Sequence, residues 1–356
     1  MPAVGHPPNI SMLPILVNRY AICTVPALLL MIKTVFSPLN YFMAQYPFNS
    51  FYAKSNKKST IFIGGLTKRG GYGKILINGG VCMQQIKFTK MHGIGNDYIY
   101  INCFEQKIED PQKLAIRMSP RRTSVGSDGL ILICPSDIAD AKMRMFNMDG
   151  SEGKMCGNGI RCVGKYLYDN GIAKKDVITV ETLSGIKTLK IEAKNGKAEF
   201  ITVDMGKPIL TPRDIPVIFD GERMVNEPLQ IMGKEYRITA VSMGNPHAVV
   251  FCGDVQGLDL EKIGPAFENA PIFPERVNTE FIRVISGTEL EMRVWERGSG
   301  ETFACGTGAC AAVVAAVLNG HCKRGEEITV RLKCGDLMIT YDENFHIYMM
   351  GAAEKV

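Results

Sequence analysis

Apolar and polar residues alternate along many short stretches from residue 83 onward, with the period of half-buried β-strands. The segments "QIKFTK" and "TELEMRVWE" predict two such strands, and "DGLILICP" predicts a short, continuously apolar one. In "KTLKIEAKNGKAEFITVDMG" two alternating runs flank the dipeptide Asn195-Gly196, which is a strong hairpin signal. The pattern therefore predicts a chain made mainly of short strands.

Three segments have helical signals instead. "DPQKLAIRM" predicts a short helix with Asp110 as N-cap and Pro111 in its first turn. "GNGIRCVGKYLYDNG" (157–171) and "GTGACAAVVAAVLNG" (306–320) each open on glycines and end at Asn-Gly, a common C-terminal helix signal.

The last two helices indicate an internal repeat. Each is preceded by a cysteine in a Cys-Gly-x-Gly turn, and these cysteines, Cys156 and Cys305, are 149 residues apart. The same shift relates four further pairs: Asn96 and Asn245, Gly129 and Asn278, Asn147 and Glu296, Glu152 and Glu301. Several polar positions at one shift predict two similarly built halves, joined near "VDMGKP" (203–208), with their cysteines facing one cleft.

Composition is that of an ordinary globular protein, with 46% hydrophobic and 22% charged residues in a chain of 356, a length that fits two domains. The net charge of +5 is unevenly spread. Residues 1–82 contain eight Lys or Arg and no acidic residue, so the rest holds 33 basic and 36 acidic residues. Because the body is not basic, we expect no nucleic-acid partner.

The eleven cysteines include no Cys-x-x-Cys pair. An odd number without that motif argues against a secreted disulfide scaffold and favours reduced cysteines in a cytoplasmic enzyme. Cys156 and Cys162 are separated by five residues, which exceeds the two-to-four-residue gap of zinc sites, and we expect no metal.

Residues 1–82 differ from the rest. Their longest apolar run, "AICTVPALLLMI", has 12 residues and contains a proline. A helix that spans a bilayer needs about 20, so we expect no membrane partner. A basic, acid-free segment also fits an organelle transit peptide. We prefer the interpretation that residues 1–82 are an N-terminal extension outside the fold and that Met83, where regular strand patterning begins, is the true start.

The paired turns have a chemical consequence. In a Cys-Gly-x-Gly turn, bare backbone N–H groups and the positive end of the helix dipole converge near the sulfur. They favour a thiolate, lower its pKa and can bind a carboxylate. Two such sites across a cleft could remove a proton from one face of a carbon and return one to the other. The sequence thus predicts a racemase or epimerase, and it contains no P-loop, convincing dinucleotide fingerprint or recognisable pyridoxal-phosphate motif.

Each candidate also has a simpler interpretation. A lone cysteine before a helix is usually a packed residue, but the flanked repeat favours function for Cys156 and Cys305. We expect Cys162 and Cys310, inside the helices, to be core residues. His247 is either a core or turn histidine or a support for the site next to Asn245. Glu296 and Arg297 could together hold the ammonium and carboxylate of a zwitterion.

The motifs "KMHGIGNDY", "FNMDGSEGKMCGNGIRC", "GNPHAVVF", "RVN" and "ERGSGETFACGTGACA" closely resemble those of diaminopimelate epimerases. The resemblance runs in order from Met83 to the C-terminus. It implies cofactor-independent epimerisation of LL-2,6-diaminopimelate to meso-diaminopimelate in lysine and peptidoglycan precursor biosynthesis, with Cys156 and Cys305 as the acid/base pair. It also implies a homodimer.

The resemblance extends to residues that bind substrate. The matching positions are Asn96, Asn147, Gly157, Asn158, Asn245, Asn278, Glu296, Arg297, Gly306 and Thr307. One departure is Gly129, where some members of the family have a substrate-contacting glutamine; we therefore leave it out of the site.

The fold implied by the resemblance is α+β, with two pseudo-symmetric domains. Each is a curved, mostly antiparallel sheet around a central helix, and the active site lies in the cleft between them. We place the first domain at 83–203, with a return of 345–356, and the second at 204–344.

Two other functions stay open at this point. A proline or hydroxyproline racemase uses the same two-thiol chemistry, although the polar Asn, Glu and Arg residues suit a second amino-acid head group better. A metal- or redox-sensing binding protein could also use the cysteines.

Overall fold

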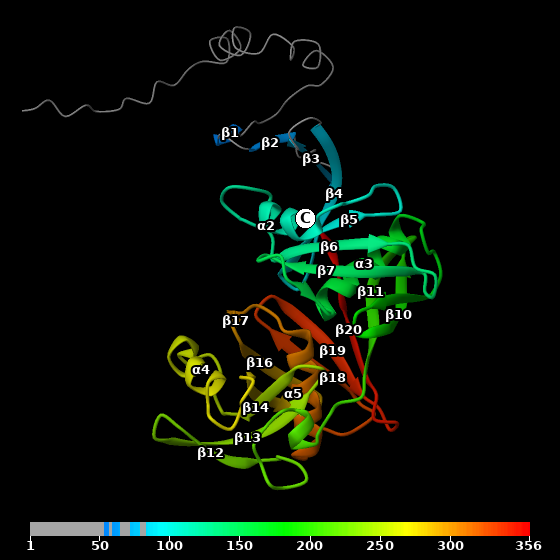
Figure 1. The fold of residues 1–356 in the computed structure, drawn as a ribbon. Coiled ribbons are helices and arrows are strands. Elements are labelled where there is room, and N and C mark those ends of the chain that lie inside the picture. Colours follow the sequence, from blue (N-terminus) through cyan, green and yellow to red (C-terminus); the bar gives the residue numbers. More distant parts are fainter. Residues whose placement is uncertain (1–52, 57–58, 65–71, 79–82) are drawn as a thin grey trace, which may run out of the picture. The chain divides into compact units, whose positions relative to one another are not determined.

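The computed structural model describes residues 53–56, 59–64, 72–78 and 83–356. Strands dominate these residues and few helices interrupt them (Figure 1). The prediction of an α+β fold is confirmed.

The first half of the body runs from residue 83 to residue 206 and contains two α-helices. Its elements are β4 (Met83–Gly93), β5 (Asn96–Asn102), α2 (Pro111–Met118), β6 (Gly129–Cys134), β7 (Ala141–Asn147), β8 (Glu152–Gly153), α3 (Gly157–Asp169), β9 (Val177–Thr182), β10 (Gly185–Lys194) and β11 (Lys197–Gly206).

The second half repeats this order after a short 3-10 helix, η3 (Pro212–Asp214), and a strand, β12 (Glu227–Ile231). Helices α3 and α5 have the same length, and the first and last residues of α5 lie 149 positions after those of α3. The repeated elements are β13 (Lys234–Ser242), β14 (Pro246–Phe251), α4 (Leu260–Glu268), β15 (Asn278–Ser286), β16 (Glu289–Glu296), β17 (Gly300–Thr302), α5 (Gly306–Leu318), β18 (Glu327–Leu332), β19 (Gly335–Tyr341) and β20 (Ile347–Ala352), followed by β21 (Glu354–Lys355).

Strand pairing follows the same repeat. Most neighbours are antiparallel, as predicted, and the parallel pairs occur at equivalent places: β5 with β6 and β7 with β9, then β14 with β15 and β16 with β18. Register is equivalent too, because Tyr98 pairs with Gly129 and His247 pairs with Asn278. The internal repeat inferred from polar residues is therefore a repeat of backbone structure.

Each half places one helix against the inner face of its strands. Helix α3 packs on β4, β5, β10 and β11, and α5 packs on β13, β14, β15 and β19. Helix α5 is apolar on every side, and a helix of that composition is stable only when it is surrounded. Buried residues of both helices, α3 and α5, belong to one continuous hydrophobic core.

The outer strand faces have cores of their own. In β6 the side chains of Ile131 and Ile133 join the core around α3, whereas Leu130 and Leu132 join a second core that includes residues of α2. A strand that is buried on both faces has no polar alternation, which explains the continuous run "GLILIC". Helix α4 contributes in the same way to a third core in the second half.

Local predictions about turns and caps are confirmed. Asn195 and Gly196 both have positive φ, 53° and 75°, between the paired strands β10 and β11. The side chain of Asp110 accepts a hydrogen bond from the backbone N–H of Lys113 at the start of α2. Helices α3 and α5 end at Asn170 and Asn319, each followed by a glycine of positive φ.

The C-terminal strands connect the two halves. Strand β20 pairs with β11 of the first half and with β19 of the second (Figure 1). Strand β21 pairs with β4. Contacts group the described residues into one unit, and the domain limits at 203 and 344 stay predictions.

Three strands lie within the predicted N-terminal extension: β1 (Ala53–Asn56), β2 (Ser59–Gly64) and β3 (Tyr72–Asn78). Strand β3 pairs antiparallel with β4 from Tyr72 opposite Thr89 to Asn78 opposite Met83. Part of the segment is thus hydrogen-bonded to the sheet. Residues 1–52 lie outside the described residues, and the boundary at Met83 stays a prediction.

Candidate active site

Cys156 and Cys305 occupy equivalent positions at the starts of the two central helices. Each is the N-cap residue, with extended backbone, φ −130° for Cys156 and −117° for Cys305. The Gly159 N–H donates to the Cys156 sulfur at 3.3 Å, and the Gly308 N–H donates to the Cys305 sulfur at 3.4 Å. The sulfur takes the place of the hydroxyl or carboxylate oxygen that usually accepts at an N-cap.

The structure brings these two helix starts together. Asn158 Nδ2 donates to the carbonyl oxygen of Ala304, the residue before Cys305, at 3.3 Å. A Cβ on Gly157 would lie 2.9 Å from Met349 Cε, and one on Gly306 would lie 3.1 Å from Met349 Sδ. The end of the Met349 side chain, from β20, therefore packs against both glycines, and a Cβ at either position would displace it.

A chain of buried and partly buried polar groups leads to Cys305. The Thr307 hydroxyl lies 3.5 Å from the Cys305 sulfur and accepts from Asn245 Nδ2 at 3.3 Å. Asn245 Oδ1 lies 3.1 Å from His247 Nε2, and His247 Nδ1 lies 2.7 Å from Glu280 Oε1. His247 and Glu280 are fully buried, and Glu280 Oε2 has no hydrogen-bond partner among the described residues. This places His247, the candidate for a supporting role, in direct contact with a predicted site residue.

A different chain leads to Cys156. Its thiol donates to Asn96 Oδ1 at 3.3 Å, and Asn96 Nδ2 donates to Asp128 Oδ2 at 2.7 Å. Arg121 binds the other oxygen of Asp128 at 2.6 Å and also pairs with Asp97. The carboxylate of Asp128 can only accept, so it fixes the Asn96 amide with its oxygen toward the sulfur.

Burial is the main cause that raises the pKa of Cys156 and of Cys305, and the carboxyl of Glu296 adds to the shift of each thiol. Glu296 accepts a hydrogen bond from Thr302. Asn278 Oδ1 accepts from the Arg297 backbone N–H at 2.9 Å, and the Arg297 guanidinium donates to the Glu275 carbonyl at 2.8 Å.

Asn147 stands apart from these contacts. It lies opposite Gly129 in the sheet, and its side chain donates to Ser151 at 2.9 Å. Within the described part of the chain no hydrogen bond joins it to another predicted site residue.

Two residues of these networks were missed from the sequence. Glu280 follows Asn278 by two positions on the same strand face, and Asp128 precedes Gly129 in "SVGSDG". The repeat could not have found them, because the shift of 149 pairs Glu280 with Ile131 and Asp128 with Val277.

The expectation that the helix N-termini lower the thiol pKa was wrong for the net effect. Burial raises the pKa of Cys156, although the Gly159 and Asn158 N–H groups and Arg161 act to lower it. Burial raises the pKa of Cys305 well above its ordinary value, and the carboxylates of Glu296 and Glu280 add to the shift. Loss of hydration outweighs the donated hydrogen bonds.

The family model described as diaminopimelate epimerase matches residues 88–211 and 239–356. A curated diaminopimelate epimerase of Acetivibrio thermocellus is 58% identical over 272 residues, which cover 76% of this chain and 96% of the relative. The chain belongs to the diaminopimelate epimerase family.

Other curated members of the family are similarly close. The diaminopimelate epimerase of Desulfovibrio desulfuricans is 56% identical over 278 residues, covering 76% of this chain and 96% of that protein. That of Bacillus cytotoxicus is 52% identical over 277 residues, covering 77% and 96%.

Solved structures support the fold alone. A probable proline racemase from Agrobacterium radiobacter K84 matches with a TM-score of 0.58 at 14% identity, covering 76% of this chain and 91% of that chain. A hydroxyproline epimerase from Agrobacterium vitis matches at 0.56 and 16% identity, covering 76% and 90%. Identities this low say nothing about which amino acid this diaminopimelate epimerase family member takes.

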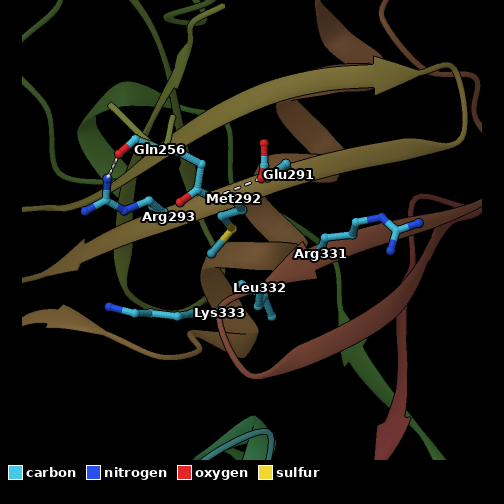
Figure 2. Close-up of a pocket in the computed structure, with 7 residues that line it drawn as sticks. All are labelled: Gln256, Glu291, Met292, Arg293, Arg331, Leu332 and Lys333. Atoms are coloured by element: carbon cyan, nitrogen blue, oxygen red, sulfur yellow. Dashed lines mark hydrogen bonds between the residues drawn. The ribbon is translucent and has the colours of Figure 1, made fainter. Parts of the chain in front are cut away.

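Other features of the family member lie outside the candidate site. Figure 2 shows the residues that line a pocket where Arg293 donates a hydrogen bond to the Gln256 carbonyl. The volume of this pocket is about 220 Å³, and no predicted site residue lines it. Arg293 is already paired with Glu301 at 2.9 Å. Cys162 and Cys310 are fully buried, as expected for core residues.

The residues that the structure describes contain no group of three or more His, Cys, Asp or Glu side chains that could hold a metal ion. None of their helices is both long and apolar enough to cross a membrane.

Proposed function

We propose that this protein interconverts LL- and meso-2,6-diaminopimelate without a cofactor, with Cys156 and Cys305 as the acid/base pair, in the biosynthesis of lysine and peptidoglycan precursors. The observation that carries the proposal is the placement of both cysteines at equivalent helix starts, joined by the Asn158 contact to Ala304. The family membership supplies the substrate, because curated relatives above 50% identity are diaminopimelate epimerases.

The proposed reaction conserves protons. The thiolate of one cysteine removes the α-proton, so that a C–H bond breaks and an S–H bond forms. The thiol of the other cysteine then gives its proton to the opposite face of the same carbon. After turnover the cysteine that began as the thiolate is a thiol, and the other cysteine is a thiolate. The enzyme is then ready to catalyse the reverse reaction on the product.

Charge stabilisation comes from the two helix starts. The carbanion formed at the α-carbon shares its charge with the adjacent carboxylate. Backbone N–H groups in the first turns of α3 and α5 can bind that carboxylate, and the positive dipole ends of these helices favour the added charge. Gly157 and Gly306 are the first residues of these two helices, and we assign their N–H groups to this role.

The remaining proposed site residues hold the parts of the substrate that do not react. Glu296 and Arg297 suit the ammonium and carboxylate of the distal centre, with Asn278 fixing the backbone of Arg297. Asn96, Asn147 and Asn245 complete the proposed substrate contacts. We retain the homodimer and the cytoplasmic location as parts of the proposal.

The test is a pair of assays on the purified, reduced protein without added cofactor. LL-diaminopimelate should be converted to the meso isomer, as followed by chiral chromatography, and L-proline and hydroxyproline should not be epimerised. Turnover of proline without turnover of diaminopimelate would overturn the proposal.

The proposed homodimer has its own test. Light scattering of the protein as it elutes from a size-exclusion column should give the mass of two chains, and the mass of one chain would contradict the dimer.

A further inference from the structure

Arg161 is a fully buried cation beneath the candidate site. Its side chain, on α3, is 0% exposed, and its partners are all uncharged. It donates to the Gly157 carbonyl at 3.2 Å, to Asn158 Oδ1 at 3.0 Å and to the Ala352 carbonyl at 3.4 Å, and it approaches Met349 Sδ at 3.7 Å. Within the described part of the chain it forms no ion pair with a carboxylate.

A buried guanidinium without a counter-ion is unusual, because charges removed from water are normally paired. Burial lowers the pKa of Arg161, but a guanidinium stays protonated in proteins. The interior around Arg161 therefore carries an uncompensated positive charge until an anion forms or binds nearby.

The position of this charge relates it to both halves. Arg161 contacts the carbonyl of Gly157, the residue after Cys156, and holds Asn158, whose amide donates to Ala304 before Cys305. The shift of 149 residues pairs Arg161 with Cys310, which is fully buried and carries no fixed charge. The guanidinium thus contacts the start of α3 directly and is linked to the start of α5 through Asn158.

The titratable groups that act on Arg161 include Cys156, the N-cap of α3, together with Cys162 of α3, Cys310 of α5 and Tyr100 of β5. Cys156 is faced in addition by Glu296 of β16, and it faces Tyr98 of β5. Among them the Cys156 thiolate is the anion that the proposed mechanism forms next to Arg161.

We propose that Arg161 is a positioning residue that supplies the fixed positive charge under both helix N-termini, stabilises the Cys156 thiolate and the substrate carboxylate there, and aligns Asn158 between the two halves. This inference rests on the proposed function for its catalytic consequence. Its effect on Cys156 in the free enzyme does not depend on turnover.

The test compares Arg161→Met with Arg161→Lys, which keeps the charge. Alkylation of each cysteine by iodoacetamide is followed against pH by peptide mass spectrometry, with the exposed Cys334 as internal reference. In Arg161→Met the Cys156 profile should move to higher pH, with a rate near pH 8 roughly tenfold lower, as expected for a rise of one pKa unit. Arg161→Lys should stay close to wild type, and Cys334 should not change in either variant.

Turnover gives the second measurement. With LL-diaminopimelate, kcat should fall more than KM rises in Arg161→Met, and Arg161→Lys should recover most of kcat. An unchanged Cys156 profile in Arg161→Met, or an equal shift in Arg161→Lys, would overturn the proposal. If Arg161→Met does not fold, Arg161→Gln serves as the neutral variant. Absence of diaminopimelate turnover in the wild type would defeat the proposed function but not a measured shift at Cys156.

Discussion

Gly308 and Gly159 offer a matched perturbation of the two thiol sites. They are equivalent under the repeat, and the N–H of each binds a cysteine sulfur. A Cβ on Gly308 would lie 2.5 Å from Glu280 Oε1, whereas one on Gly159 would lie 2.7 Å from Ile131 Cδ1. The methyl end of Ile131 can move, but the Glu280 carboxylate is held in a fully buried pair with His247.

The magnitude for Gly308→Ala follows from this contact. Ordinary contact is about 3.5 Å, so the carboxylate or helix must shift by roughly 1 Å. Overpacking of this kind lowers the free energy of unfolding by about 1–3 kcal/mol. The higher helix propensity of alanine offsets at most about 1 kcal/mol of that loss. We expect a net loss of about 1–2 kcal/mol. A shift of roughly 1 Å at the Cys305 turn should also reduce kcat by about 10²-fold.

The assay is diaminopimelate epimerisation together with thermal unfolding of both variants. Gly308→Ala should lose most of its activity and melt a few degrees lower, and Gly159→Ala should retain most of both. Equal losses in the two variants, or full activity in Gly308→Ala, would refute the assignment of Glu280 and His247 as a rigid support for Cys305.

Three further predictions concern charge and pH. Because burial raises the pKa of both thiols, kcat/KM should increase from pH 7 toward pH 9, by up to about tenfold per unit, and a flat profile would contradict the buried-thiol geometry. Removing the Glu280 charge should lower the pKa of Cys305, so Glu280→Gln should move the rising limb of that profile to lower pH; an unmoved limb would show that the charge does not act on the thiol. In Asp128→Ala the Asn96 amide loses its anchor, so kcat should fall with little change in melting temperature, and unaltered kinetics would show that Asn96 needs no anchor.

Much of the fold could be predicted from the sequence, because local turn and helix-end residues and the pattern of buried positions indicated the same elements. The repeat, the hairpin at Asn195-Gly196 and the helix ends at Asn-Gly all depend on local chemistry that single residues carry. Strand β6 shows the limit, since "GLILIC" does not say that its two faces enter different cores.

The candidate site was less readable where it depends on long-range contacts. The repeat found the cysteines because equivalent sites need equivalent residues. Glu280, Asp128 and Arg161 have no equivalent in the other half, so symmetry could not indicate them. The direction of the thiol pKa shift could not be predicted from the sequence either, because it depends on how completely the fold excludes water from the two sulfurs.

The central claim is that two thiols on opposite sides of one carbon exchange its proton. The most direct measurement is deuterium incorporation at the inverted α-carbon during turnover of LL-diaminopimelate in deuterated water, followed by mass spectrometry and chiral chromatography. The wild type should place one solvent deuterium at each inverted centre, and Cys156→Ala and Cys305→Ala should both lose inversion. Inversion that persists in either single variant would contradict the two-thiol account.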